Sequence, residues 1–453
     1  MSKLKILLLP VALIFAANLW SSAQVQLSEV ASPADAKVNR ERGNQMLQDI
    51  KNVLKERYYD KNFHGIDIEK RFKAASDQIK TMDTNSQIFT EIAQLLLEFD
   101  DSHTYFLPPG RANSVEYGFT MQMIGDVCFV TDVKKGSDAE IKGLKPGDQI
   151  KSIGRFVPTV DSLWKLTYLI YTLDPQASLT LHLAGPNNTD RMLEVKAKFK
   201  SIEDRKKEAD AVRNKKRENP YKCQAVDADL VACRLDSFSV DKKDIDKMMS
   251  EASRYKKLVL DLRGNRGGYV SIEGYLLGHF FDHPVKIADF IARDKKTESI
   301  AKVQEERAFK GELVILVDSD SASASEIFAR VIQIQKRGRI VGDVSAGAVM
   351  TSNYIPITEI RGLVVLARVS VFALNVTVGD VIMSDGNRLE KVGVIPDRPV
   401  GPTSLALSKG WDPVLSLAAG LLGVKLTPEE AGKFNFIYKK YENEAVDESD
   451  TDN

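Results

Sequence analysis

The stretch Glu312–Gly342, ELVILVDSDSASASEIFARVIQIQKRGRIVG, has the pattern of a strand, a helix and a second strand. A continuous apolar run opens it, apolar residues then recur at helical spacing, and Gly338 ends the helical pattern before RIVG. A similar unit, KLVLDLRGNRGGYVSIEGYLLGHFF, lies upstream at residues 257–281. Buried strands that are each followed by a helix are typical of α/β layers, so we expect an α/β core from about residue 221 onward.

Three serines alternate where the strand pattern changes into the helix pattern: Ser321, Ser323 and Ser325. A serine at such a turn projects its hydroxyl, and the start of the helix offers free N–H groups and a positive dipole end to a developing anion. Serines are also good helix caps, and Glu326, three residues after Ser323, would complete a capping box. A nucleophile needs a base and an oxyanion hole, so this motif alone leaves both roles open.

The loop LDLRGNRGGYV, residues 260–270, is a candidate oxyanion hole. Gly267 and Gly268 carry no side chains, so their N–H groups are open to an approaching carbonyl group. A plain turn between a strand and a helix would have the same composition. The loop therefore gains weight only together with the serine motif.

The two loops in combination resemble the S41 family of serine peptidases, which includes the C-terminal-processing (tail-specific) proteases. The resemblance extends over nearly the whole chain after its first segment. It implies an α/β catalytic core with ClpP/crotonase-like layers and a PDZ-like β domain inserted in or preceding that core. It also implies that Ser323 is the nucleophile and that the N–H groups of Ala324 and Gly267 bind the oxyanion, with Gly268 as the neighbouring possibility.

The catalytic base departs from the tail-specific pattern. Those proteases use a lysine in the loop after the VG strand, and the corresponding residue here is Ala348 in VGDVSAGA. An alanine cannot accept a proton. Either the protein is catalytically inactive or its base comes from another segment.

His103, in EFDDSHTYFLPP, offers that other base. The segment resembles the DSHT motif of the tricorn-core-like S41 branch, in which a histidine replaces the lysine. The resemblance implies that Ser102 joins the hydrogen-bond network and that Glu390, just before GVIPD, orients the imidazole. A histidine titrates near neutrality, and a carboxylate can fix its tautomer. Asp343, Asp380 and Asp385 are acidic alternatives to Glu390, and we interpret the other four histidines (His64, His182, His279 and His283) as structural.

The segment between the histidine and the core has the strand, helix and turn order of a PDZ domain. PDZ domains add an extended peptide as a strand and hold its C-terminal carboxylate with the backbone N–H groups of a glycine-containing loop. The matching loop here contains Tyr117, Gly118 and Phe119, and residues 120–123 would be the pairing strand. We predict the following layout: signal peptide 1–23, helical region 37–112, PDZ-like domain 113–200, charged linker or exposed helix 201–220, peptidase core 221–402, and a C-terminal helix with an acidic tail 403–453.

The N-terminus has the features of a cleaved secretory signal. Two lysines precede an apolar run from Ile6 to Ala17, which is too short to span a membrane, and SSA at residues 21–23 suits a signal peptidase. We therefore expect an exported protein, periplasmic or extracellular, that begins near Gln24. Of the three cysteines, Cys223 and Cys233 either bridge neighbouring strands or stay reduced, and Cys128 is free.

The sequence as a whole predicts a secreted serine endopeptidase that acts on polypeptides, possibly through their free C-termini. The 63 basic and 63 acidic residues cancel, which gives no reason to expect a nucleic-acid partner. No metal or organic cofactor is expected, since no residues have ligand spacing. One alternative is an inactive peptide-binding or scaffold protein of the same fold, because Ala348 replaces the lysine. Another is a carrier of small hydrophobic ligands, which would need a large apolar cavity.

Overall fold

A six-stranded sheet forms the centre of the molecule. The structure is a computed structural model that describes residues 32–110, 113–185, 189–304, 308–360 and 368–436. All neighbouring strands of the sheet run parallel except the edge strand β9, which is antiparallel to β10. The strands, in spatial order, are β18 (Arg398–Pro399), β15 (Arg339–Gly342), β14 (Glu312–Val317), β11 (Lys257–Asp261), β10 (Leu230–Leu235) and β9 (Tyr221–Ala225).

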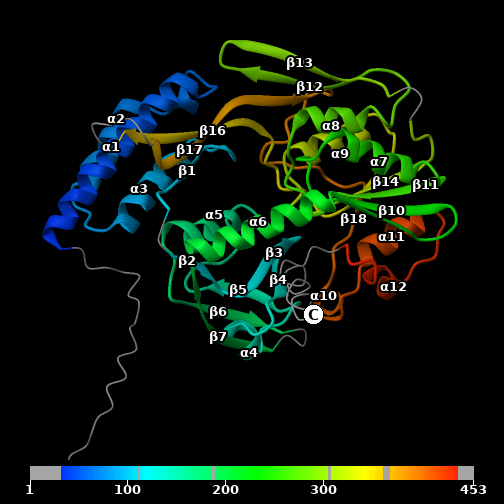
Figure 1. Cartoon of the computed structure of the whole chain (residues 1–453), viewed down its shortest axis with the longest axis horizontal. Coiled ribbons are helices and arrows are strands. Elements are labelled where there is room, and N and C mark those ends of the chain that lie inside the picture. Colours follow the sequence, from blue (N-terminus) through cyan, green and yellow to red (C-terminus); the bar gives the residue numbers. More distant parts are fainter. Residues whose placement is uncertain (1–31, 111–112, 186–188, 305–307, 361–367, 437–453) are drawn as a thin grey trace, which may run out of the picture.

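Helices cover both faces of this sheet, as the sequence predicts for an α/β core (Figure 1). Successive strand residues point to opposite faces. Leu258 and Leu260 of β11 therefore join the apolar cluster of α7 (Lys242–Ala252), α8 (Val270–Leu277) and α9 (Ala324–Ile334). Val259, between them, joins the cluster of α11 (Pro413–Leu421) and α12 (Pro428–Gly432).

A second sheet lies on the far side of α8 and α9 (Figure 1). It has the long strand β17 (Arg368–Met383) at its centre, and the sequence analysis did not predict its strands. The others are β1 (Tyr105–Leu107), β12 (Val285–Ala292), β13 (Lys295–Ala301) and β16 (Met350–Ile360). Residues of β12 and β17 belong to the same apolar cluster as α8 and α9, so the two sheets share one helical layer.

The helical region contains three helices, α1 (Pro33–Arg57), α2 (Ile68–Ile79) and α3 (Asn85–Leu97). Their apolar faces pack against each other and against Phe372 and Leu374 of β17. The three helices therefore complete their core with a strand that lies almost 300 residues later in the chain. Figure 1 shows them next to β16 and β17.

The middle segment forms its own five-stranded antiparallel sheet. The order is β3 (Phe119–Ile124), β4 (Val127–Val133), β5 (Gln149–Ile153), β6 (Ser178–Ala184) and β7 (Asp190–Lys196). Two helices accompany it: α4 (Asp138–Ile141) and α5 (Leu163–Tyr168), the latter continued by a π-turn at Leu169–Leu173. The entering strand β2 (Asn113–Glu116) pairs with the leaving strand β8 (Lys198–Ser201). The chain thus enters and leaves this module at one place.

The charged stretch at 201–220 forms a single helix, α6 (Ile202–Glu218), whose described side chains are mostly exposed. Of the two possibilities that the sequence left open, a linker or an exposed helix, the structure has the helix. It crosses the molecule between the middle segment and the core in Figure 1.

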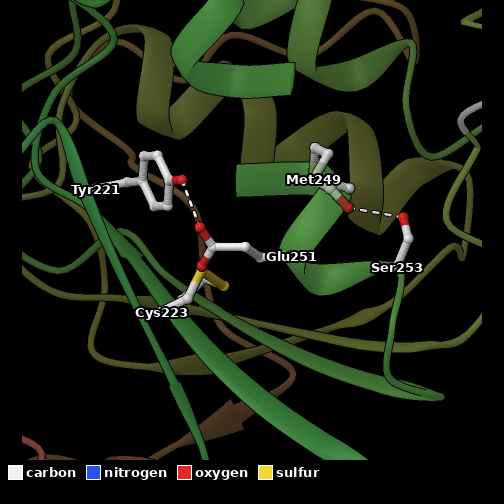
Figure 2. The surroundings of a disulfide bond; sticks show 6 residues. Tyr221, Cys223, Met249, Glu251 and Ser253 are labelled. Carbon is white, nitrogen blue, oxygen red and sulfur yellow. Dashed lines mark hydrogen bonds between the residues drawn. A yellow bond between two sulfur atoms is a disulfide. The ribbon is translucent and has the colours of Figure 1, made fainter. Parts of the chain in front are cut away.

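A disulfide joins the two strands at one edge of the central sheet. Cys223 of β9 lies directly opposite Cys233 of β10, and their sulfur atoms are bonded. Figure 2 shows this edge, where the Tyr221 hydroxyl donates to Glu251 of α7 at 2.7 Å. Cys128 is a buried free thiol in β4.

The C-terminal part contains α10 (Ser404–Lys409) as well as α11 and α12, where the sequence predicted one helix. The predicted signal peptide and acidic tail lie outside the described residues. Within the described ranges, no helix has the length and apolar character needed to cross a bilayer.

Candidate active site

Ser323 occupies the turn between β14 and α9 in a conformation that is rare for serine. Its φ is 56° and its ψ is −119°, a backbone region that residues other than glycine seldom adopt. Its N–H donates to the carbonyl of Ala348 at 3.0 Å and to Glu326 Oε2 at 2.9 Å. A contact with the distant residue Ala348 and one with Glu326 in the first turn of α9 therefore hold this strained backbone.

The glycine loop comes close to the serine only because it lacks side chains. A Cβ on Gly267 would lie 2.8 Å from Ser323 Cβ and 3.1 Å from the Ala324 nitrogen. A Cβ on Gly268 would instead lie 2.5 Å from the backbone of Phe238. Both glycines have positive φ values, 93° and 146°. Gly267 thus gives room beside the serine, and Gly268 packs against the neighbouring segment.

The N–H groups that are available beside Ser323 differ in part from the oxyanion donors that the sequence analysis expected. The Gly267 N–H, an expected oxyanion donor, already donates to the side chain of Asn265 at 2.9 Å. Among the residues that the structure describes, the N–H groups of Gly268 and Ala324 have no partner. Ala324 is the first residue of α9, where N–H groups lack partners within the helix. The geometry therefore favours Gly268, the neighbouring possibility, over Gly267 as the second donor.

Asn265 is a residue that the sequence analysis missed. It is fully buried and connects the two loops: its carbonyl accepts from the Ala322 N–H at 3.0 Å and from the Ser325 hydroxyl at 2.8 Å. Its amide nitrogen donates to Leu235 at 2.8 Å. The only sequence signal was its place inside the DLRGNRGG loop.

His103 lies in the turn before β1 and contacts Ser102. Its Nδ1 lies 2.6 Å from Ser102 Oγ, and that hydroxyl donates to Glu390 Oε2 at 2.9 Å. The Ser102 N–H donates to Glu390 Oε1 at 2.8 Å. A hydroxyl has one proton, so Ser102 accepts from the ring N–H at Nδ1 and leaves the lone pair of neutral His103 on Nε2. Glu390 thus acts on the imidazole through Ser102.

Asp101 fixes the backbone of this turn and was also missed from sequence. Its carboxylate accepts from the N–H groups of His103 and Thr104 at 2.9 and 2.6 Å. It also accepts from the hydroxyls of Tyr58 at the end of α1 and Thr377 of β17, at 2.8 and 2.7 Å. The helical region and the second sheet therefore meet on this one buried carboxylate, directly behind His103.

The serine and the histidine segments meet at two consecutive residues. Ala348 accepts the Ser323 N–H, and the N–H of the next residue, Val349, donates to Glu390 Oε2 at 2.8 Å. Ala348 is also the residue that the sequence analysis matched to the lysine of the tail-specific proteases. The turn of Ser323 and the network of His103, separated in sequence by the whole middle segment, are thus linked through residues 348–349.

Burial shifts the pKa values of two groups in this network. Burial lowers the pKa of His103 below its ordinary value, and the nearby charge of Asp101 opposes this effect. Burial also raises the pKa of Glu390, against the hydrogen bonds from Val349 and Ser102. A histidine with a lowered pKa is neutral at neutral pH, so its Nε2 can accept a proton.

The residues expected to bind peptide ends lie in the middle segment. Tyr117 and Phe119 are buried, and the Tyr117 hydroxyl contacts the backbone of Gln176, so their side chains belong to the module's core. Gly118 has a φ of 73° and packs against Ser137.

Strand β3 of this module touches the turn that precedes the nucleophile. The Gln122 side chain donates to Asp318 at 2.9 Å, and the Ser319 hydroxyl donates to the Met123 carbonyl. Asp318 in turn accepts from the Gly264 N–H in the glycine loop at 2.8 Å. The strand therefore contacts the same loop system that holds Ser323.

The other titratable residues considered have partners elsewhere. Asp343 accepts from Gly125, Asp380 from Arg388 and Asp385 from Arg330, so Glu390 is the one of these four carboxylates that contacts Ser102. Each of the remaining histidines has a partner outside the site: His64 contacts Phe99, His182 contacts Asp190, His279 contacts Asp246, and His283 contacts Asp282. Within the described ranges, no three histidine, cysteine or acidic side chains are arranged to hold a metal ion.

Comparison with known proteins relates part of this chain to a peptidase family. Residues 229–400 match the model of peptidase family S41. The chain is 27% identical over 269 residues to the tail-specific protease of Haemophilus influenzae, covering 54% of this chain but 36% of that protein. It is 25% identical over 390 residues to the chloroplastic C-terminal processing peptidase of Tetradesmus obliquus, covering 77% of this chain and 75% of the relative.

Solved structures show the same mixed α/β fold. The structure of mature CPAF aligns with a TM-score of 0.63 over 82% of this chain and 94% of its own, at 14% identity. The photosystem II D1 C-terminal processing protease aligns with a TM-score of 0.50 over 80% and 93%, at 21% identity. At these identities the likeness concerns the fold alone.

Proposed function

On the premise that residues 229–400 form a domain of peptidase family S41, we propose that this protein is a serine endopeptidase that cleaves proteins or peptides through an acyl-enzyme on Ser323. His103 is its general base, and Ser102 and Glu390 are positioning residues. The observation that carries the proposal is the link through residues 348–349, where the Ser323 N–H meets Ala348 and the next N–H meets Glu390.

In the proposed reaction, Ser323 Oγ attacks the carbonyl carbon of the peptide bond while its proton passes to His103 Nε2. The oxyanion that forms accepts hydrogen bonds from the N–H groups of Ala324 and Gly268. His103 then gives its proton to the departing amine, and the carbon–nitrogen bond breaks. Water, deprotonated by the same nitrogen, hydrolyses the ester and returns the proton to Ser323.

The middle segment is proposed to be a PDZ-like module that brings polypeptide ends to the site. Its strand β3 is the terminal strand of the sheet, which suits the addition of an extended peptide, and the contacts of Gln122 and Met123 with the turn before Ser323 support a coupling between the two. Export is proposed as well. The Cys223–Cys233 disulfide supports it, because such bonds persist mainly in oxidising compartments.

The test compares four purified proteins that start at Gln24: the unmodified chain and the variants Ser323→Ala, His103→Ala and His182→Ala. The substrates are an unfolded protein and a fluorogenic peptide. We expect the first two variants to lose about 10⁴-fold or more in kcat. His182→Ala changes a histidine outside the site, in β6, and should keep full activity.

If the unmodified protein is folded but inert toward both substrates and toward a serine-reactive fluorophosphonate, the endopeptidase proposal fails. The inactive peptide-binding alternative would then be the better account. Export is tested separately, by sequencing the N-terminus of the protein recovered outside the cytoplasm, where Gln24 is the expected first residue.

A further inference from the structure

Glu326, in the first turn of α9, is buried with 0% of its surface exposed, and the proposed reaction gives it no step. Its carboxyl group nevertheless accepts four hydrogen bonds. Oε1 accepts from the Ser345 hydroxyl at 2.6 Å and from the Gly347 N–H at 2.8 Å. Oε2 accepts from the N–H groups of Ser323 at 2.9 Å and Ala348 at 3.0 Å.

This pattern requires an ionised group. A carboxylate has about four lone-pair positions and no proton, which matches four donors. Three of the partners are backbone N–H groups, which cannot accept a hydrogen bond. A proton on Glu326 would therefore displace at least one donor, and only the Ser345 hydroxyl is able to accept that proton.

The four donors come from the two segments that must be aligned. One is the nucleophile itself, and the other three belong to residues 345–348 after β15. That second segment continues into Val349, which holds Glu390 and through it Ser102. Glu326 thus links the serine turn to the chain that carries the base network, but it contacts no reacting atom.

We propose that Glu326 is a positioning residue whose ionised carboxylate holds the strained backbone of Ser323 against residues 345–348, so that the nucleophile faces both the oxyanion donors and His103. The inference rests on the proposed peptidase function. It assigns the glutamate of SASASE to alignment of the active site, beyond its role as the partner in a helix cap.

The protonation of Glu326 adds a pH dependence to this role. Burial raises the pKa of Glu326 to about 7, against the four hydrogen bonds, which lower it. The Glu326 carboxyl group is therefore ionised above about pH 7, and it loses its charge as the pH falls through that value. The segments packed against it carry Glu390 and Lys391, whose backbone N–H contacts Gly347, and His103 lies beyond Glu390. Two of these residues, Glu390 and His103, also belong to the base network.

The test uses Glu326→Gln, in which the amide nitrogen would point at backbone donors. Glu273→Gln is the matched control, because Glu273 is also 0% exposed but has no hydrogen-bond partner among the described residues. We expect Glu326→Gln to lower kcat about 100-fold, as for a small misplacement of reacting groups, with KM changed less than about threefold. Labelling of Ser323 by a fluorophosphonate should slow in parallel. Glu273→Gln should change neither.

Amide hydrogen exchange gives a readout that does not depend on activity. In Glu326→Gln, peptides that contain residues 321–327 and 344–350 should exchange faster than in the unmodified protein, and Glu273→Gln should leave them unchanged. Glu326→Asp keeps the charge on a shorter side chain and should lie between; it replaces the glutamine variant if that one does not fold. If the unmodified enzyme cuts, and Glu326→Gln keeps its kcat, its pH profile and its exchange rates, the inference about Glu326 is wrong while the peptidase proposal stands. If the enzyme is inert, the exchange experiment alone tests whether Glu326 holds the Ser323 backbone against residues 345–348.

Discussion

The Ser323 N–H donates to the carbonyl oxygen of Ala348 at 3.0 Å, so the residue that the sequence analysis matched to the lysine of the tail-specific proteases lies directly against the proposed nucleophile. His103, the proposed base, is connected to the next residue along the chain, Val349, through Ser102 and Glu390. The residue matched to the lysine and the network of the proposed histidine base therefore meet at the consecutive positions 348 and 349.

The first prediction concerns replacement of the histidine base by a lysine at residue 348. In a His103→Ala background, Ala348→Lys should restore part of the lost activity, on the order of 10-fold above His103→Ala alone, because a general base contributes about 10²–10⁴ and this one is not optimised. Its rate should rise with pH, since lysine must lose its proton to act. Peptide hydrolysis from pH 6 to 10 measures this, and Ala348→Arg, which cannot lose its proton, is the control.

A second prediction is the shape of the acid side of the pH profile. Glu326 must be ionised, and burial raises the pKa of Glu326 to about 7. His103 must be neutral, and burial lowers the pKa of His103. As pH falls, log(kcat/KM) should first drop with a slope near one below about 7, then more steeply once His103 takes up its proton. A single step of slope one centred well below 6.5 would contradict the requirement for ionised Glu326.

Asp101 is expected to matter for both stability and rate. Asp101→Asn places an amide nitrogen among hydrogen-bond donors, so we expect a loss of about 2–3 kcal/mol of unfolding free energy and a fall in kcat of about 100-fold. Tyr58→Phe removes one donor to Asp101 and should cost about 1 kcal/mol. Chemical denaturation and hydrolysis assays on both variants are the measurement. Equal effects of the two substitutions would argue against the idea that Asp101 stabilises the protein through several hydrogen bonds at once.

Replacement of Glu273 should stabilise the protein, whereas replacement of Asp101 should destabilise it. Burial raises the pKa of Glu273 well above its ordinary value, so the folded state keeps the group neutral while the unfolded state ionises. A raised carboxyl pKa contributes stability below the unfolded pKa of about 4.3, and this contribution is lost as the pH rises toward the folded pKa. Relative to the unmodified protein, the unfolding free energy of Glu273→Gln should therefore rise by up to about 1.4 kcal/mol for each pH unit between the unfolded and the folded pKa of Glu273. Thermal unfolding at pH 4.5 and pH 7.5 measures it, with a higher Tm of the variant expected only at the higher pH.

The sequence predicts the parts of this protein that are local and repeated. Apolar runs, glycines and helical spacing indicate the βα units around LDLRGNRGG and SASASE. The periodicity of apolar residues indicates the N-terminal helices. The second sheet was not predicted, because β17 takes its partners from β1 and β12, about 270 and 90 residues earlier in the chain, as well as from the adjacent β16. Such pairing has no local signal.

The site shows the same division. Residue types and motifs are enough to single out Ser323, Ser102, His103 and Glu390 for testing. They are not enough to tell which glycine N–H is free, since the side chain of Asn265 decides this by occupying Gly267. They also do not show that Asp101 and Glu326 each collect donors from segments far apart, because those partners become neighbours only in the folded chain.

Ser102 and Glu390 are 288 positions apart, and one donates two hydrogen bonds to the other. In this protein the proposed base cannot be oriented until the segment around residue 390 has emerged and folded back onto the first hundred residues. The chain order therefore determines when this contact can form: the pairing of Ser102 with Glu390 requires almost the whole polypeptide to be made and folded.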